Sequence, residues 1–118
     1  YKPGKELSRR IELRGPDPTC NPYLIMAVTL AAGMKGIADE LPLPPESTVP
    51  FDQLAESGAA RLPRDLGEAI REFENSEFVH EALGDHIFNY LLEEKRREWA
   101  EYSQTVTDWE LRHYYGGF

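Results

Sequence analysis

The sequence feature that most constrains the fold is a long apolar run that begins at Asn21-Pro22. Asn is a strong helix N-cap and Pro is favoured at the first helical position, so a helix is predicted from Pro22 to about Leu41. From Tyr23 to Ala32 only one residue, Thr29, is polar. Because so little of the helix surface is polar, the helix is predicted to be buried on most sides. In a chain of 118 residues, it indicates a helix that also packs against a partner.

The segment before this helix, Arg9–Arg14, alternates charged and apolar residues and is predicted to be a strand. The alternation places Arg10, Glu12 and Arg14 on one face, and Ile11 and Leu13 on the other. Two prolines, Pro16 and Pro18, then end the strand. A lone strand has no ladder partner, so it either frays in this chain or pairs with residues outside it.

A carboxylate between two guanidiniums suits a site for a metal ion and phosphate. The Glu12 carboxylate is a ligand for a hard cation such as Mg²⁺, and the guanidiniums of Arg10 and Arg14 match phosphate or carboxylate oxygens. The same alternation also occurs on the solvent side of ordinary half-buried strands, where the charges form weak surface ion pairs. The pattern alone leaves both interpretations open.

The remainder of the chain predicts helices, which makes the fold class mainly α with one N-terminal strand. Helix starts are predicted at Asp65, Ser76, Asp85 and Thr107, and Gly84 is predicted to stop the second of these helices. The last helices are predicted over about 86–104 and from 107 to about 115. We predict a single domain over 1–118, with a loop and strand at 1–15, the apolar helix at 16–41, a Pro-rich connector at 42–63, and a helical bundle and tail at 64–118.

Composition narrows the classes of function. The formal net charge of −8 argues against nucleic-acid binding, and no apolar run is long enough to span a bilayer. The single cysteine, Cys20, favours a reducing cytoplasm and has no histidine base close in sequence, so a packing role is favoured over catalysis. Because the chain begins with Tyr1 rather than Met, we expect it to be a piece of a larger protein.

Two further sets of residues are weighed as sites. The three histidines (His80, His86 and His113) lack the spacing of metal ligands. The aromatic residues near the C-terminus fit core packing better than a ligand cage, although the spacing alone leaves both possible. These residues are Trp99, Tyr102, Trp109, Tyr114 and Tyr115.

A longer pattern carries a family resemblance. The run RRIELRGPDPTCNPYL over residues 9–24, continued by LAAGMKGI over 30–37, resembles the C-terminal part of the catalytic domain of bacterial and archaeal type I glutamine synthetase. The segment LPRDLGEA at 62–69, and the segments around Trp99 and Trp109, resemble the helices that follow it in that family. The resemblance covers essentially the whole chain.

The resemblance implies an ATP-dependent ligase that joins ammonia to glutamate through a γ-glutamyl phosphate. It assigns Glu12 to the divalent cation (Mg²⁺ or Mn²⁺), Arg10 to the ATP phosphates, and Arg14 to the glutamate substrate and the transferred phosphate. It also implies a cytoplasmic homo-oligomer, a dodecamer in the family, that uses neither nucleic acid nor membrane. The family's other metal ligands lie upstream of the matched segment, so the chain alone is expected to be inactive.

Other interpretations remain open at this stage. A related ligase that joins glutamate to a polyamine or another amine would carry the same residues in this segment. A helical assembly module without catalysis is a second possibility. Some family members are adenylylated on a tyrosine in the connector, where this chain has Phe51, so that control is expected to be missing.

Overall fold

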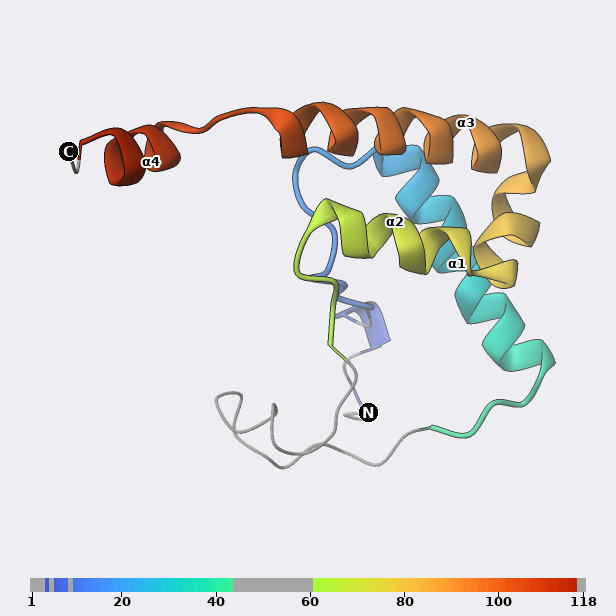
Figure 1. Cartoon of the computed structure of the whole chain (residues 1–118). Helices are drawn as coiled ribbons and strands as arrows, with labels where there is room; N and C mark the ends of the chain where they lie inside the picture. Colours follow the sequence, from blue (N-terminus) through green and yellow to red (C-terminus); the bar gives the residue numbers. More distant parts are fainter. Residues whose placement is uncertain (1–3, 5, 9, 44–60, 117–118) are drawn as a thin grey trace.

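The computed structural model describes residues 4, 6–8, 10–43 and 61–116, which are mainly helical (Figure 1). In chain order the elements are η1 (Glu6–Ser8), α1 (Pro22–Ala38), α2 (Leu66–Glu74), α3 (Glu77–Gln104), α4 (Asp108–Glu110) and a π-helical turn, η3 (Leu111–Tyr115). The mainly α class is therefore confirmed. The described residues contain no strand, and residues 10–14 run as irregular chain. The predicted strand is not formed there because these residues have no neighbouring strand to pair with.

Helix α1 begins where its caps predict and ends slightly earlier than expected. The Asn21 side chain accepts hydrogen bonds from the backbone N–H groups of Tyr23 (3.0 Å) and Leu24 (3.3 Å). At the other end, the N–H of Leu41 donates to the carbonyl of Gly36 (3.0 Å), and Glu40 adopts a φ of 49°. This is a Schellman arrangement with a glutamate in the left-handed position that usually favours glycine. The helix therefore stops at Ala38 rather than near Leu41.

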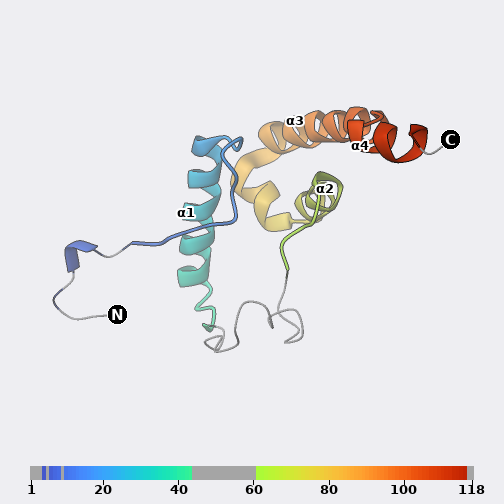
Figure 2. The ribbon, with the colours of Figure 1, turned by 90° about the vertical axis from the view of Figure 1, so that its left-hand side faces the viewer.

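Helices α2 and α3 form the part of the chain that has a core. The Asp65 side chain caps α2 through the N–H of Glu68 (2.8 Å), and Ser76 caps α3 through the N–H of Val79 (3.2 Å). Side chains of Ile70, Phe88 and Leu92 are buried between the two helices. The Phe73 and Phe88 rings stack with centroids 4.7 Å apart. Figure 2 shows α2 lying beside α3, with α1 to the left of both helices.

Gly84 breaks α3 where the sequence predicts a helix stop. Its φ of 72° and ψ of 159° are not helical, and the chain turns there before the helix resumes. This conformation is accessible essentially only to glycine. The helices predicted on either side of Gly84 are thus the two arms of a bent α3 (Figure 1).

The expected burial of α1 is wrong for this chain. None of its residues is buried, and the side chains of Tyr23 and Ile37 are 81% and 74% exposed. The accessible surface of the chain is 11,026 Å², against about 6,500 Å² for a compact monomer of this mass. The radius of gyration is 19.2 Å, against about 13 Å for a compact domain. Helix α1 is apolar on several sides, but among the described elements only α3 packs against it.

The C-terminal segment extends away from α2 and α3 (Figure 1). Thr107 and Glu110 form a capping box at the predicted start of α4, in which each side chain accepts a hydrogen bond from the other residue's backbone N–H. The chain then continues through η3 to Tyr115. Within the described residues, none of the helices combines the length and the apolar character needed to cross a bilayer.

Candidate functional site

The charged segment brings two of its three predicted site residues into contact. The Nε and Nη2 atoms of Arg14 lie 2.6 Å and 2.5 Å from the same oxygen of Glu12, Oε1. Both side chains are exposed, at 86% for Arg14 and 56% for Glu12. Arg10 is also exposed. The segment thus carries a guanidinium–carboxylate pair that faces solvent.

The apolar residues of the segment face a different surface. Ile11 and Leu13 line an apolar groove of about 670 Å³, together with Met26, Leu30 and other residues of α1. The predicted separation of Ile11 and Leu13 from Glu12 and Arg14 therefore holds without a strand. The groove is open, since Ile11 and Leu13 are 84% and 57% exposed. Cys20 is half-buried and lines the same groove, which agrees with a packing role.

A tight turn joins the charged segment to α1. Oδ1 of Asp17 accepts hydrogen bonds from the backbone N–H and the hydroxyl of Thr19, both at 2.6 Å. These hydrogen bonds lower the pKa of Asp17, with the hydroxyl as the largest cause. The carbonyl of Asp17 accepts from the N–H of Cys20 (3.2 Å), and Asn21 then caps α1. Short-range hydrogen bonds thus fix how the segment enters the helix.

The donor chemistry of Glu12 fits a hard divalent cation, but one carboxylate is only part of such a site. Mg²⁺ takes six oxygen ligands, of which proteins commonly supply one or two carboxylates. Within the described ranges, no three His, Cys, Asp or Glu side chains are grouped closely enough to hold a metal ion. Glu12 can therefore act as one ligand of such a site, and the described residues do not form a complete site around it.

Two of the three histidines, His80 and His113, take part in other contacts. Nε2 of His80 lies 2.7 Å from Oδ1 of Asp85, and the His80 ring stacks on Phe88 with centroids 4.3 Å apart. Nδ1 of His113 lies 2.9 Å from the carbonyl oxygen of Trp109, and the two rings stack. Arg9, Phe51 and the connector at 44–60 lie outside the described residues.

Comparison with known families decides what kind of chain carries this segment. The family model described as "Glutamine synthetase, catalytic domain" matches residues 2–114. The chain belongs to the glutamine synthetase family. The matched range includes Arg10, Glu12 and Arg14, together with every helix of the described structure except the last residue of η3.

Known glutamine synthetases from bacteria and archaea are similar over most of this chain. The enzyme of Mycolicibacterium smegmatis is 44% identical over 119 aligned positions, which cover 97% of this chain and 27% of the relative. That of Mycobacterium tuberculosis is 46% identical over 120 positions, with the same coverage. That of Methanosarcina mazei is 46% identical over 110 positions, which cover 89% of this chain and 25% of the relative. The chain therefore spans about a quarter of the length of these glutamine synthetases.

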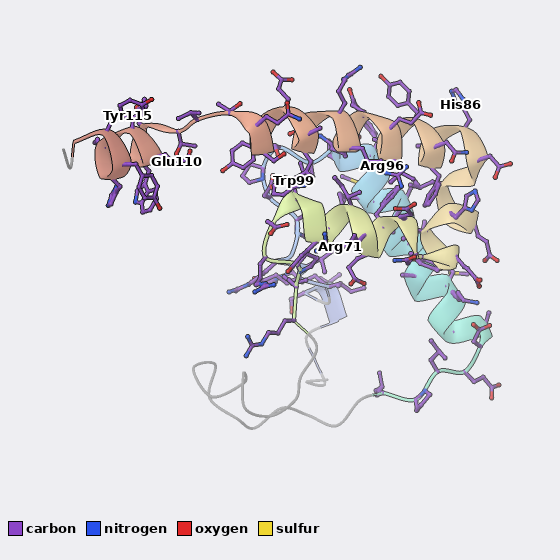
Figure 3. All side chains as sticks on the ribbon, in the orientation of Figure 1. Arg71, His86, Arg96, Trp99, Glu110 and Tyr115 are labelled. Atoms are coloured by element: carbon purple, nitrogen blue, oxygen red, sulfur yellow. The ribbon has the colours of Figure 1, made fainter. Side chains whose placement is uncertain are left out.

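One close packing contact was not anticipated from the sequence. Figure 3 shows Trp99 of α3 close to the start of α2. A Cβ added to Gly67 of α2 would be only 2.7 Å from the indole ring of Trp99. The signal in the sequence was the glycine itself at the second position of a capped helix. Glycine has a low helix propensity, so its presence there indicates a need for space. The sequence could not supply the partner, because Trp99 is 32 residues further along the chain.

Proposed function

We propose that this chain is the C-terminal portion of the catalytic domain of a glutamine synthetase, an enzyme that ligates ammonia to glutamate with ATP. The observation that carries the proposal is the match to the catalytic-domain family over residues 2–114. The contact between Glu12 and Arg14 supports it, because the two groups given roles in the reaction lie together on one exposed face. Arg10 belongs to the same alternating pattern.

The proposed roles follow from the charges in the reaction. ATP phosphorylates the side-chain carboxylate of glutamate, and ammonia then displaces the phosphate from the γ-glutamyl phosphate. Arg14 contacts the glutamate substrate and the transferred phosphate, and Arg10 contacts the ATP phosphates. Glu12 is a ligand of the Mg²⁺ or Mn²⁺ ion, which when bound neutralises charge on the phosphates. The two guanidiniums have the same effect as the cation. Fixed positive groups stabilise the negative charge that spreads over the phosphoryl group during its transfer.

The incomplete site explains why we propose that the 118-residue chain has no activity by itself. Among the described residues, Glu12 is the carboxylate assigned to the proposed cation site, no three possible metal ligands are grouped together, and the Glu12–Arg14 pair is open to water. A phosphoryl-transfer site needs several fixed ligands and exclusion of bulk solvent. Turnover of ATP by the purified 118-residue chain in the presence of glutamate and ammonia would contradict this proposal.

The setting of the enzyme is proposed from the same family. We propose a homo-oligomer, a dodecamer by resemblance, that works in the cytoplasm on glutamate, ATP and ammonia and contacts neither nucleic acid nor membrane. The exposed apolar surface of α1 supports packing against further protein, because contiguous apolar patches of this kind mark interaction surfaces.

The test is substitution of Glu12 in the native-length enzyme, with phosphate release dependent on both glutamate and ammonia as the measurement. Glu12→Gln is expected to reduce kcat/KM by about 10²-fold or more, the size of effect seen when one electrostatic group is removed from an active site. The matched control is Glu68→Gln, which removes a carboxylate of α2 that is paired to Arg64 just before the helix. This variant should retain activity within about twofold, because Glu68 is not assigned to the reaction and its partner Arg64 is exposed to solvent.

Three outcomes would change the proposal. Equal losses in the Glu12 and Glu68 variants would place the effect of Glu12 in folding rather than in catalysis. Phosphate release that depends on glutamate but requires a larger amine in place of ammonia would assign the chain to a γ-glutamyl-amine ligase of the same family. Loss of all activity in the unsubstituted native-length protein would support a helical assembly module.

A further inference from the structure

A cavity of about 700 Å³ lies between the start of α2 and the last turns of α3. Two of its walls are aromatic, formed by Trp99 and Tyr102. Carboxylates of Asp65, Glu98 and Glu101 line it as well. The cavity lies in the helical part of the chain and includes none of the residues proposed for the ligase reaction. Its combination of flat apolar surface and negative charge differs from that of the apolar groove beside α1.

The aromatic wall is held in place by the packing of α3 on α2. The rings of Trp99 and Tyr102 stack with centroids 5.8 Å apart and an interplanar angle of 30°. Trp99 is half-buried and lies on Gly67, which leaves its indole ring little freedom to move. Tyr102 is 63% exposed. The pair therefore presents a fixed surface that a ligand can reach, and such ring faces attract cations.

The charges around the cavity favour a positive ligand near Glu101. Arg64 also lines the cavity, but its guanidinium is ion-paired to Glu68. Glu98 is paired to Lys95 (2.6 Å), and Asp65 caps α2 by accepting from the N–H of Glu68. Among the residues that the structure describes, no ion pair involves Glu101. This carboxylate is thus the acidic group of the cavity that is open to a new positive partner.

The end of α3 adds to this preference. Glu101, Tyr102 and Thr105 lie at the C-terminus of the helix, where the helix dipole places a partial negative charge. Such an end is commonly neutralised by Lys or Arg in the last turn, but the last turn of α3 has no basic residue. A cation bound in the cavity would supply the missing positive charge.

We propose that this cavity binds an organic cation, namely a guanidinium or primary ammonium group on an alkyl stem. The charged group lies beside Glu101 and the end of α3, and the stem lies against Trp99 and Tyr102. A bare divalent ion fits less well, because the described residues place no three acidic or histidine ligands together. The shared chemistry has two sources: a free small cation, or an arginine or lysine side chain of another protein. The proposal does not depend on the proposed ligase function.

The test is titration of the full chain with two probes, butylguanidinium chloride and a blocked peptide that contains one arginine. The indole N–H resonance of Trp99 reports binding, and it is assigned with a Trp109→Phe variant. Saturable shifts are expected with a Kd on the order of 1 mM, because exposed cation–π contacts and ion pairs are individually weak. Glu101→Gln should weaken binding about threefold or more. Glu81→Gln, the same change on the other arm of α3, is the matched control and should bind like the parent chain.

Each result of these titrations either supports the proposal or overturns it. Absence of a saturable shift with both probes would overturn it, as would equal affinities of the Glu101→Gln and Glu81→Gln variants. Tyr102→Leu provides a second variant, because Tyr102 is exposed and its loss should leave the fold intact while weakening binding. Binding of the peptide at least as tight as that of butylguanidinium would identify a protein side chain as the ligand. Binding of butylguanidinium alone would identify a small free cation.

Discussion

Helix α1 and the pair formed by α2 and α3 differ in how their apolar residues are used. Helix α1 is the more apolar in sequence, yet it has no buried residue. Helix α2 is much more polar overall, but its apolar residues lie on one face and pack against α3 around Ile70, Phe88 and Leu92. A narrow apolar stripe can be covered by one neighbouring helix, whereas a helix that is apolar on most sides needs several neighbours. The comparison shows that apolar content does not by itself predict burial within one chain.

The difference also bears on the place of the chain in its family. The described residues contain one packed unit, formed by α2 and α3, and one helix, α1, that is largely exposed. A chain that spans about a quarter of the length of its relatives is consistent with this uneven packing. Four substitutions or titrations test whether the two regions differ in energy as they do in packing, in order from the largest expected effect to the smallest.

The largest effect is expected from removing a core side chain of the α2–α3 unit. Phe88 is 5% exposed and stacks on both Phe73 and His80. Phe88→Ala should lower the free energy of unfolding by about 3–5 kcal/mol, because it removes a buried ring and leaves a cavity. Leu30→Ala, in α1 where the side chain is 68% exposed, should change it by less than about 0.5 kcal/mol. Urea unfolding followed by far-UV circular dichroism measures both, and similar costs would refute the comparison.

The next effect concerns the bend in α3. Gly84 has a φ of 72°, and an alanine there should lower the free energy of unfolding by about 1–3 kcal/mol because of backbone strain. Gly36 in α1 is the matched control, since it is helical and an added Cβ meets no atom within 4 Å. Gly36→Ala should be neutral or stabilising by up to about 1 kcal/mol. If Gly84→Ala were as stable as the parent chain, the two arms of α3 would be able to join into one straight helix.

A smaller effect tests the packing of Trp99 on α2. Gly67→Ala improves helix propensity by about 1 kcal/mol, but it places a Cβ 2.7 Å from the Trp99 ring. Moving a packed indole costs about 1–3 kcal/mol, so a net loss of about 1 kcal/mol is expected. Gly33→Ala in α1 meets no neighbour within 4 Å and should stabilise the helix instead. Thermal unfolding of the two variants should therefore give shifts of opposite sign, and shifts of the same sign would contradict the close contact.

The smallest effect is electrostatic. Hydrogen bonds from the side chain and backbone of Arg64 lower the pKa of Glu68 to about 2, from an ordinary value of 4.5. Because the folded state binds its proton less tightly, the contribution of Glu68 to stability is present above about pH 4.5 and is lost as the pH falls toward 2. NMR titration of the Glu68 carboxyl carbon should give a midpoint near pH 2. Arg64→Gln should return the midpoint toward the ordinary value, and an unchanged midpoint would show that Arg64 is not the cause.

Local signals in the sequence predicted the helices well. Asn21, Asp65, Ser76 and Thr107 all cap the helices that they were expected to start, because a cap depends on residues only two or three positions away. Gly84 interrupts α3 for a similar reason, since its backbone conformation is a local property. The end of α1 was less predictable, because a glutamate rather than a glycine takes the left-handed position there.

The candidate site was predicted in part. The alternation correctly separated Ile11 and Leu13 from Glu12 and Arg14, and the last two are in contact. A strand was expected there, but hydrogen bonding between strands requires a second segment, and the described residues provide none. The roles of Arg10, Glu12 and Arg14 in catalysis stay predictions.

The sequence by itself determined where helices begin, that Glu12 and Arg14 share a face of the charged segment, and the family to which the chain belongs. These properties depend on neighbours in the chain or on a pattern of residues in order. Only the tertiary structure decided that Trp99 packs on Gly67, that α2 and α3 share a core, and that α1 stays exposed. Burial depends on which surfaces meet in space, and residues far apart in sequence supply those surfaces.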